Sequence, residues 1–352
     1  MMTRRSNSEC SDEALERVAP IHLTWVLRHA VNRLLPLAIV AVGLIAYLLL
    51  QQRDLVQEVF ASLSRLAPAA VVQALLLVIV QVLCQGLRFS MLVPSDVGAS
   101  RLSVLRAFSV GEVFNALVPA RVGDAVKVIT LGHSPANQGS ALSQVTGALL
   151  ADKVVDAGTL VGLSAIALAA AGIGRLSASG LAGNLRWVAA GVAVVLALVL
   201  VLPLTVRRGR ATGWRARARD FGRGVRLGFS TLREPRRVFG GAAFGVAGRF
   251  AEVYVIHTVS ASLNIPLTAA PIMLAIALLN LGILVPLSIA NLGAYEAALA
   301  FGLTLWGVPI APAIAIATAH HVIELTGIAT TASLISIVQQ WRTAPHSSHP
   351  PR

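Results

Sequence analysis

The sequence predicts an all-α, polytopic integral membrane protein with about six full spans and two re-entrant or broken helical hairpins in an inverted repeat. Composition supports this class, because 56% of the 352 residues are hydrophobic, only 13% are charged and the mean hydropathy is +0.74. A further observation is that Arg, Lys, Asp and Glu stand inside apolar segments that proline or glycine interrupts. These features exclude an ordinary soluble protein.

The chain opens with a polar stretch and a first apolar run. Residues 1–33 predict a basic cytoplasmic tail with an interfacial helix, and residues 34–50 predict a first span that is retained, since no small-residue cleavage site follows it. A mixed-charge loop at 53–65 leads to a second span at 68–91. Arg88, near the end of that span, is either an interfacial anchor or a ligand for a phosphate.

The next segments are apolar but broken by charges. Residues 101–118 stop at Pro119, and residues 121–133 are too short and too charged to span. We interpret them as a re-entrant hairpin that enters and leaves on the cytoplasmic side, because non-helical backbone at membrane depth needs protein or water around it. A long helix at 139–170 and a span at 186–206 complete this half.

An arginine-rich loop, 207–237, separates a first membrane half, 34–206, from a second, 238–340. It holds eleven arginines against two acidic residues, so the positive-inside rule places the loop and both termini in the cytoplasm. We therefore attribute the net charge of +13 to orientation and to anionic lipid headgroups rather than to nucleic acid. The tail at 341–352 has a disordered composition.

The second half follows the plan of the first. Residues 238–260 predict a span, residues 268–286 and an arm that ends at Val308 predict a second hairpin, and residues 312–338 predict the last helix. Counted from a cytoplasmic N-terminus, the first hairpin follows the second full span and the second hairpin follows the fifth, so the two hairpins should enter from opposite sides and meet near the midplane.

Short motifs in the two halves can be aligned. NALVP ends at Pro119 and GILVP ends at Pro286, and DKVVD at 152–156 falls opposite HHVIE at 320–324. A broken apolar segment with charges at the break is typical of a discontinuous helix around a site inside the membrane. The hinge positions of the two hairpins are predicted at Asn115, Pro119, Gly123, Pro286 and Gly293.

Three charges share one flank of the predicted helix at 139–170. Asp152, Lys153 and Asp156 would each cost about 2.5 to 3.5 kcal/mol if they faced lipid, so they should face one another or water. They form either a proton or ion relay or an internal salt bridge that orders the helix. Arg249 and Glu252 predict a further pair, at i and i+3, that lines the same cavity.

Two further groups of side chains allow alternative interpretations. Arg121 and Lys127 lie beside the broken helix and are placed to hold a lipid phosphate, or Arg121 pairs with Asp124 and pins the loop. His320 and Glu324, one turn apart, predict either a titrating relay or ordinary polar packing. Two ligands on one helix do not make a zinc site, so no metal is predicted.

Four motifs together resemble one family. LRF at 87–89, NALVPARVGDAVKV at 115–128, DKVVD at 152–156 and VPLSIANLGAYEAAL at 285–299 are similar to the flippase-like membrane domain at the N-terminus of lysylphosphatidylglycerol synthases and to its stand-alone relatives. The resemblance covers residues 35–338 and implies movement of lipids across the bilayer. It places ten residues on family motifs: Asn115, Pro119, Arg121, Gly123, Asp124, Asp152, Lys153, Asp156, Gly293 and Glu296.

The sequence departs from the family pattern at several of these motifs. The family commonly has Arg where this chain has Lys127 and Lys153, Glu where it has Asp152, and a Pro-Gly-Gly loop where it has residues 288–291. These exchanges keep the charge but change reach and forked geometry, which leaves room for a different substrate. No aminoacyl-transfer domain is found, so lipid aminoacylation is not expected.

The sequence as a whole predicts a translocase, and not an enzyme, that moves an anionic phospholipid or lipid-linked intermediate across a bacterial cytoplasmic membrane. The alternatives are a membrane-embedded enzyme or accessory subunit acting on a lipid carrier, and a carrier of a water-soluble anion. No nucleotide-binding GxxxxGK[ST] motif occurs and no cofactor is expected. The predicted phosphate ligands are Arg88, Arg121, Lys127 and Lys153, and the predicted relay or site-structuring residues are Asp124, Asp152, Asp156, Glu296, His320 and Glu324.

Overall fold

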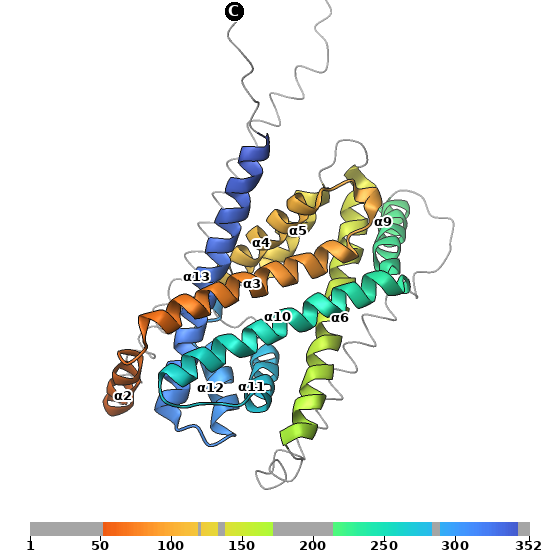
Figure 1. Cartoon of the computed structure of the whole chain (residues 1–352). Coiled ribbons are helices and arrows are strands. Elements are labelled where there is room, and N and C mark those ends of the chain that lie inside the picture. The colour runs from red at the N-terminus through yellow and green to blue at the C-terminus, as the bar shows by residue number, and fades with distance from the viewer. Residues whose placement is uncertain (1–51, 119–120, 133–137, 172–213, 284–288, 344–352) are drawn as a thin grey trace, which may run out of the picture. The chain divides into compact units, whose positions relative to one another are not determined.

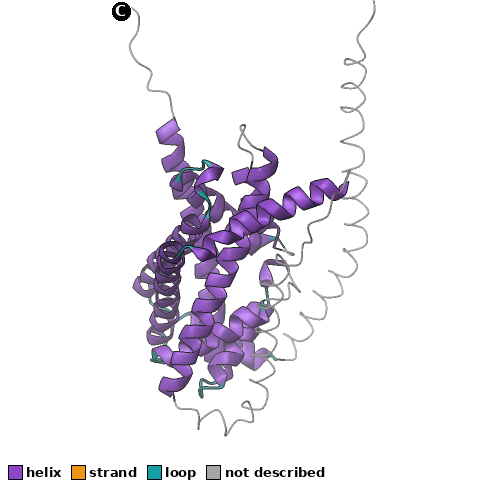
Figure 2. Ribbon diagram, turned by 90° about the vertical axis from the view of Figure 1, so that its right-hand side faces the viewer, coloured by secondary structure: helices purple, strands orange, loops and turns teal. Residues whose placement is uncertain are grey.

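The computed structural model describes residues 52–118, 121–132, 138–171, 214–283 and 289–343, and the regular elements in these ranges are helices (Figures 1 and 2). The chain divides into two units, Met1–Glu58 and Val59–Arg352, and every feature discussed below except the start of the helix at 53–63 belongs to the second. The predicted spans at 34–50 and 186–206, and the predicted hinges Pro119 and Pro286, lie outside the described residues.

A succession of one long helix, two short helices and a 34-residue helix occurs twice in the described chain. The first comprises α3 (Pro68–Leu92), α4 (Arg101–Leu117), α5 (Val122–Gly132) and α6 (Gln138–Ala171). The second comprises α10 (Pro235–Ser262), α11 (Ala269–Gly282), α12 (Ala294–Thr304) and α13 (Ile310–Thr343). The long helices α3, α6, α10 and α13 are long and apolar enough to cross a membrane, which confirms the predicted class of helical membrane protein.

Local sequence chemistry sets where several of these helices begin. Pro68 opens α3 and Pro235 opens α10, at a position where a helix has no use for a backbone N–H. Ser100 caps α4 by accepting a hydrogen bond of 3.1 Å from the N–H of Ser103. Gly293, with φ at +83°, precedes α12 in a conformation that glycine adopts without strain.

The structure differs from the predicted secondary structure in three segments. Helix α2 (Arg53–Leu63) occupies the segment predicted as a mixed-charge loop, and α9 (Trp214–Phe229) occupies the middle of the predicted arginine-rich loop. The last helix continues to Thr343, past the predicted end at 338, so residues 341–343 are helical. The arginines of α9 led to the prediction of a loop, yet two of its glycines, Gly224 and Gly228, are packing positions.

Helices α6 and α9 approach each other at glycine contacts. A Cβ added at Gly147 would lie 2.0 Å from the carbonyl oxygen of Val225, and one added at Gly228 would lie 1.9 Å from that of Gln144. Small residues allow two backbones this close. Arg223 of α9 is exposed and lies 3.2 Å from Asp220, so one face of α9 packs on α6 and another carries an exposed ion pair.

We expect Gly228→Ala to destabilise the protein by about 1 to 3 kcal/mol, because the new methyl group meets backbone that has no room to yield. Gly158→Ala on α6 is the matched control, since a Cβ at Gly158 meets nothing within 4 Å. Thermal unfolding of the detergent-solubilised protein measures the stability of both variants. Equal midpoints for the two variants would contradict the close packing of α6 and α9.

The main apolar core lies among the long helices and the second hairpin. Helix α10 runs beside α3, and a hydrogen bond of 3.1 Å from Arg237 to the carbonyl oxygen of Val93 ties the start of α10 to the end of α3 (Figure 1). Five fully buried side chains from α3, α10, α11, α12 and α13 are Val78, Ile256, Ile276, Leu299 and Ile316. This core supports a set of buried charged side chains that the same helices carry.

Candidate functional site

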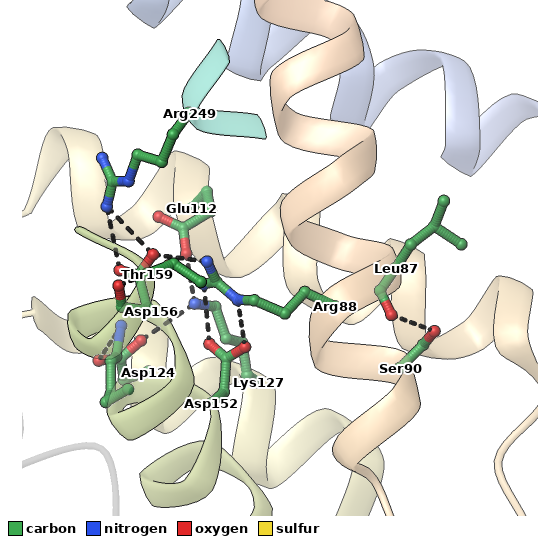
Figure 3. Close-up of polar contacts among 11 residues, drawn as sticks. Leu87, Arg88, Ser90, Glu112, Asp124, Lys127, Asp152, Asp156, Thr159 and Arg249 are labelled. Carbon is green, nitrogen blue, oxygen red and sulfur yellow. Dashed lines mark hydrogen bonds and ion pairs between the residues drawn. The ribbon is translucent and has the colours of Figure 1, made fainter. Parts of the chain in front are cut away.

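Arg88 on α3 is held by two carboxylates of α6 (Figure 3). Its Nε lies 2.8 Å from Oδ1 of Asp152 and its Nη2 lies 3.2 Å from Oδ2 of the same side chain, while Nη1 lies 2.5 Å from Oδ1 of Asp156. Arg88 is 4% exposed and Asp152 is 1% exposed. The interpretation of Arg88 as an interfacial anchor is therefore wrong, because its head group is buried in a forked ion pair.

Asp156 also binds a second arginine, from α10. Nη2 of Arg249 lies 3.0 Å from Oδ1 and 3.2 Å from Oδ2 of Asp156, and Nη1 lies 2.7 Å from Oε2 of Glu252. The predicted pair of Arg249 and Glu252 is thus present, and it is joined to the α3–α6 pair through Asp156. This arginine chain, which we define as Asp152, Arg88, Asp156, Arg249 and Glu252, contains two cations and three carboxylates.

A second cluster lies between α4 and α5. The ammonium of Lys127 pairs with Glu112 and lies 3.0 Å from Oδ1 of Asp124. It also lies 4.5 Å from the centre of the Phe108 ring, a cation–π contact. The Lys127 side chain has no exposed surface, and its two carboxylate partners compensate its charge inside the protein.

Asn115 joins the two arms of this first hairpin. Its Nδ2 donates to Oδ1 of Asp124 at 3.1 Å, and its Oδ1 accepts from the backbone N–H of Asp124 at 3.2 Å. The arms touch closely, since a Cβ at Gly123 would lie 1.8 Å from the carbonyl oxygen of Gly111. Asn115 and Gly123, both predicted as hinge residues, therefore lie where α4 and α5 are clamped together.

Two predicted phosphate ligands are more open than Arg88 and Lys127. The side chain of Lys153 is 39% exposed and its Nζ makes one ion pair, at 3.6 Å to Asp124. Arg121 is exposed and has φ at +52°, a left-handed conformation that turns the chain into α5. Asp124 bonds to Asn115, Lys127 and Lys153, so the alternative that pairs it with Arg121 is not what the structure shows.

A third cluster joins α12 to α13. The hydroxyl of Tyr295 lies 2.7 Å from Nδ1 of His320 and donates a hydrogen bond to Oε2 of Glu324. His320 has no exposed surface, and its Nε2 has no hydrogen-bond partner among the described residues. A buried nitrogen in this state is rare enough to need an explanation.

The neighbouring pair on the same helices has a structural role. Nδ1 of His321 lies 2.7 Å from Oε1 of Glu296, and the other carboxylate oxygen of Glu296 accepts from the backbone N–H of Gly293 at 2.7 Å. The Tyr295 ring stacks on His321 at a centroid distance of 4.0 Å. Glu296 thereby caps the N-terminus of α12 with one oxygen and holds the imidazole of His321 with the other.

Sequence reasoning placed most of these residues but not their partners. It grouped Asp152, Lys153 and Asp156 on one flank, whereas the structure pairs Lys153 with Asp124 and both aspartates with Arg88. Glu112 and Tyr295 were not predicted as site residues, and the only signal for Glu112 was a charge inside an apolar segment. Among the described residues no group of three or more His, Cys, Asp or Glu is arranged to hold a metal ion.

Comparison with known proteins identifies the family. A family model described as lysylphosphatidylglycerol synthase TM region matches residues 33–331, a range that contains every side chain of the three clusters. No curated protein and no solved structure matches the chain. The resemblance predicted from the motifs is thereby confirmed. With its apolar spans and this match over most of its length, the chain is an integral membrane protein that belongs to the family of lysylphosphatidylglycerol synthase transmembrane regions.

Proposed function

We propose that this protein is a lipid translocase, which moves an anionic phospholipid or a lipid-linked intermediate across the membrane. The observation that carries the proposal is the contrast among the buried cations. Arg88, Lys127 and Arg249 are each enclosed by two carboxylates, whereas Lys153 stands at the edge of the same network with a side chain that is 39% exposed and, among the described residues, one long ion pair. Lys153 is thus the cation best placed to receive a headgroup phosphate.

The other charges then have a supporting role in this proposal. The arginine chain and Lys127 hold α3, α4, α5, α6 and α10 in register, and Arg121, which directly precedes α5, is a second exposed phosphate ligand. The left-handed backbone at Arg121 is a strained conformation of the kind that collects at ligand sites. The acyl or prenyl tails remain in the bilayer throughout.

We further propose that the two helix successions form an inverted repeat with re-entrant hairpins at α4–α5 and α11–α12. The supporting feature is the matching order and the equal length of α6 and α13, each 34 residues. The positive charge of the 207–237 segment orients both termini toward the cytoplasm in this arrangement. The host membrane is proposed to be a bacterial cytoplasmic membrane.

Lipid movement tests this function. Proteoliposomes containing a fluorescent anionic phospholipid, treated with a membrane-impermeant quencher, report how fast the lipid reaches the outer leaflet. We expect Lys153→Ala to slow this exchange about 10- to 100-fold, because a hydrogen bond to a charged group contributes about 1.5 to 3 kcal/mol. Arg101→Ala, at an exposed arginine in the first turn of α4, is the control that should exchange at the wild-type rate.

The same vesicles separate the alternative functions. Exchange no faster than in protein-free vesicles would overturn the translocase. A change in the mass of the lipid would favour an enzyme acting on a lipid carrier, and competition by a soluble headgroup analogue without lipid movement would favour a carrier of water-soluble anions.

A further inference from the structure

The cluster that the translocase proposal leaves without a role is Tyr295, His320 and Glu324. The three side chains are linked in one line, in which the tyrosine hydroxyl bridges the imidazole Nδ1 and the carboxylate. His320 and Tyr295 lie in the packed interior of α12 and α13, at 0% and 5% exposed, and the Glu324 side chain is 21% exposed. We call them the tyrosine triad.

Hydrogen-bond bookkeeping assigns the protons of this triad. A tyrosine hydroxyl has one proton, and here it is donated to Glu324. The Tyr295 oxygen must then accept from Nδ1–H of His320, which leaves Nε2 of the neutral imidazole as a bare lone pair. That nitrogen is the buried atom without a partner in the described chain. Because burial disfavours a charged imidazole, a proton that reaches this nitrogen is expected to be passed on along the line rather than kept there.

The charged side chains around the triad also favour the uptake of a proton. From α10, Glu252 and Arg249 act electrostatically on it, and from α4 Glu112 does the same. Glu112 is paired with Lys127, and Glu252 meets a single guanidinium, which it shares with Asp156, so these cations already have carboxylate partners other than Glu324. A carboxylate that is largely removed from water and has no cation of its own is favoured in its protonated form.

The remaining neighbours of the triad leave this imbalance in place. Glu296 on α12 is bound to His321, which lies on α13 beside the triad. Helix α3, which also packs on α13, carries Cys84 and Arg88 as its titratable groups, and Arg88 is occupied by Asp152 and Asp156. None of these groups supplies a free permanent cation to Glu324.

We propose that the tyrosine triad binds one transported proton and so couples lipid movement to a proton gradient, an inference that rests on the translocase function. A proton binds Nε2 of His320, the proton on Nδ1 moves to the Tyr295 oxygen, and the original hydroxyl proton moves to Glu324. The triad then holds a neutral carboxylic acid, a tyrosine and an imidazole protonated at Nε2. One proton has entered and the charge has risen by one. The same steps in reverse, after the site has opened to the other side of the membrane, release the proton there.

The test is the steady-state distribution of lipid under a pH difference. Proteoliposomes with the fluorescent anionic phospholipid are held at zero membrane potential, and the plateau is approached from both leaflets until the two curves meet. With one proton per lipid, a difference of one pH unit shifts the ratio between leaflets about tenfold, because both correspond to about 1.4 kcal/mol. The plateau does not depend on how much of the protein is folded, since that changes only the rate.

Tyr295→Phe keeps the ring that stacks on His321 and removes the bridging hydroxyl, so we expect the tenfold shift to disappear. Glu324→Gln should abolish it as well. Tyr254→Phe, at an exposed tyrosine of α10, is the control that should keep the full shift. A wild-type plateau that ignores the gradient, or a Tyr295→Phe plateau that follows it, would overturn the coupling and leave the translocase standing. Absence of lipid movement in the wild type would instead overturn the translocase, and the coupling with it.

Infrared spectroscopy gives a readout that does not require transport. Difference spectra between high and low pH should contain the carbonyl band of a buried protonated carboxylic acid. The band should be lost in Glu324→Gln and shifted in Tyr295→Phe, and retained unchanged in Tyr254→Phe. A wild-type protein without this band would refute proton binding at Glu324.

Discussion

Arg88→Ala is expected to lower the free energy of unfolding by about 3 to 5 kcal/mol, because it leaves a buried carboxylate without its cation. Asp152, which is 1% exposed, has its two oxygens bound by Arg88 alone among the ion pairs of the described chain, whereas Asp156 keeps Arg249. Thermal or denaturant unfolding of the solubilised protein measures the loss.

A double variant isolates the cause of this loss. Arg88→Ala combined with Asp152→Asn removes the unpaired charge, so the double variant should be more stable than Arg88→Ala alone. If the loss of stability in the double variant equalled the sum of the losses in the two single variants, the two side chains would not interact, which would contradict the forked ion pair. Arg88→Lys keeps the charge, but one ammonium cannot bind both oxygens of Asp152 and an oxygen of Asp156 as the guanidinium does. Its free energy of unfolding should therefore lie between those of the wild type and Arg88→Ala.

Gly123→Ala is expected to reduce lipid exchange about 100-fold, the size of effect that a displacement of about 1 Å in a site produces. The new methyl group would lie 1.8 Å from the carbonyl oxygen of Gly111 and 2.6 Å from Oδ1 of Asn115. The α5 arm must therefore move away from α4, which breaks the two bonds between Asn115 and Asp124 and opens the slot that holds Lys127.

The control for this variant is Gly162→Ala on α6, where an added Cβ meets nothing within 4 Å. Alanine has a higher helix propensity than glycine, so propensity alone would stabilise the helix in both variants. The proteoliposome assay with the fluorescent phospholipid compares them directly. Wild-type exchange in Gly123→Ala would mean that the close contact of the two arms is unimportant for transport.

The sequence predicted the helices better than their contacts. Apolar length and proline positions placed α3, α6, α10 and α13 within a few residues, because these signals are local. Helix α9 was missed because its arginines were interpreted as an orienting loop, and its packing on α6 depends on a surface that is distant in the chain.

The candidate site illustrates the same limit. The pair of Arg249 and Glu252 was predicted, since residues three apart on a helix are neighbours. The pair of Arg88 and Asp152 joins positions 64 apart, and nothing in the local pattern specifies that Arg88 turns inward instead of toward the interface. Tyr295 was missed for a different reason: an isolated tyrosine is ordinary in a membrane helix, and only its place between His320 and Glu324 gives it a chemical role.

Asp156 makes the contact of α6 with α3 and its contact with α10 depend on each other. One carboxylate holds a guanidinium from α3 and another from α10, and its Oδ1 accepts from both. A shift of this one side chain therefore disturbs both contacts at once. Its removal would leave Arg88 and Arg249 with a single carboxylate partner each, Asp152 and Glu252.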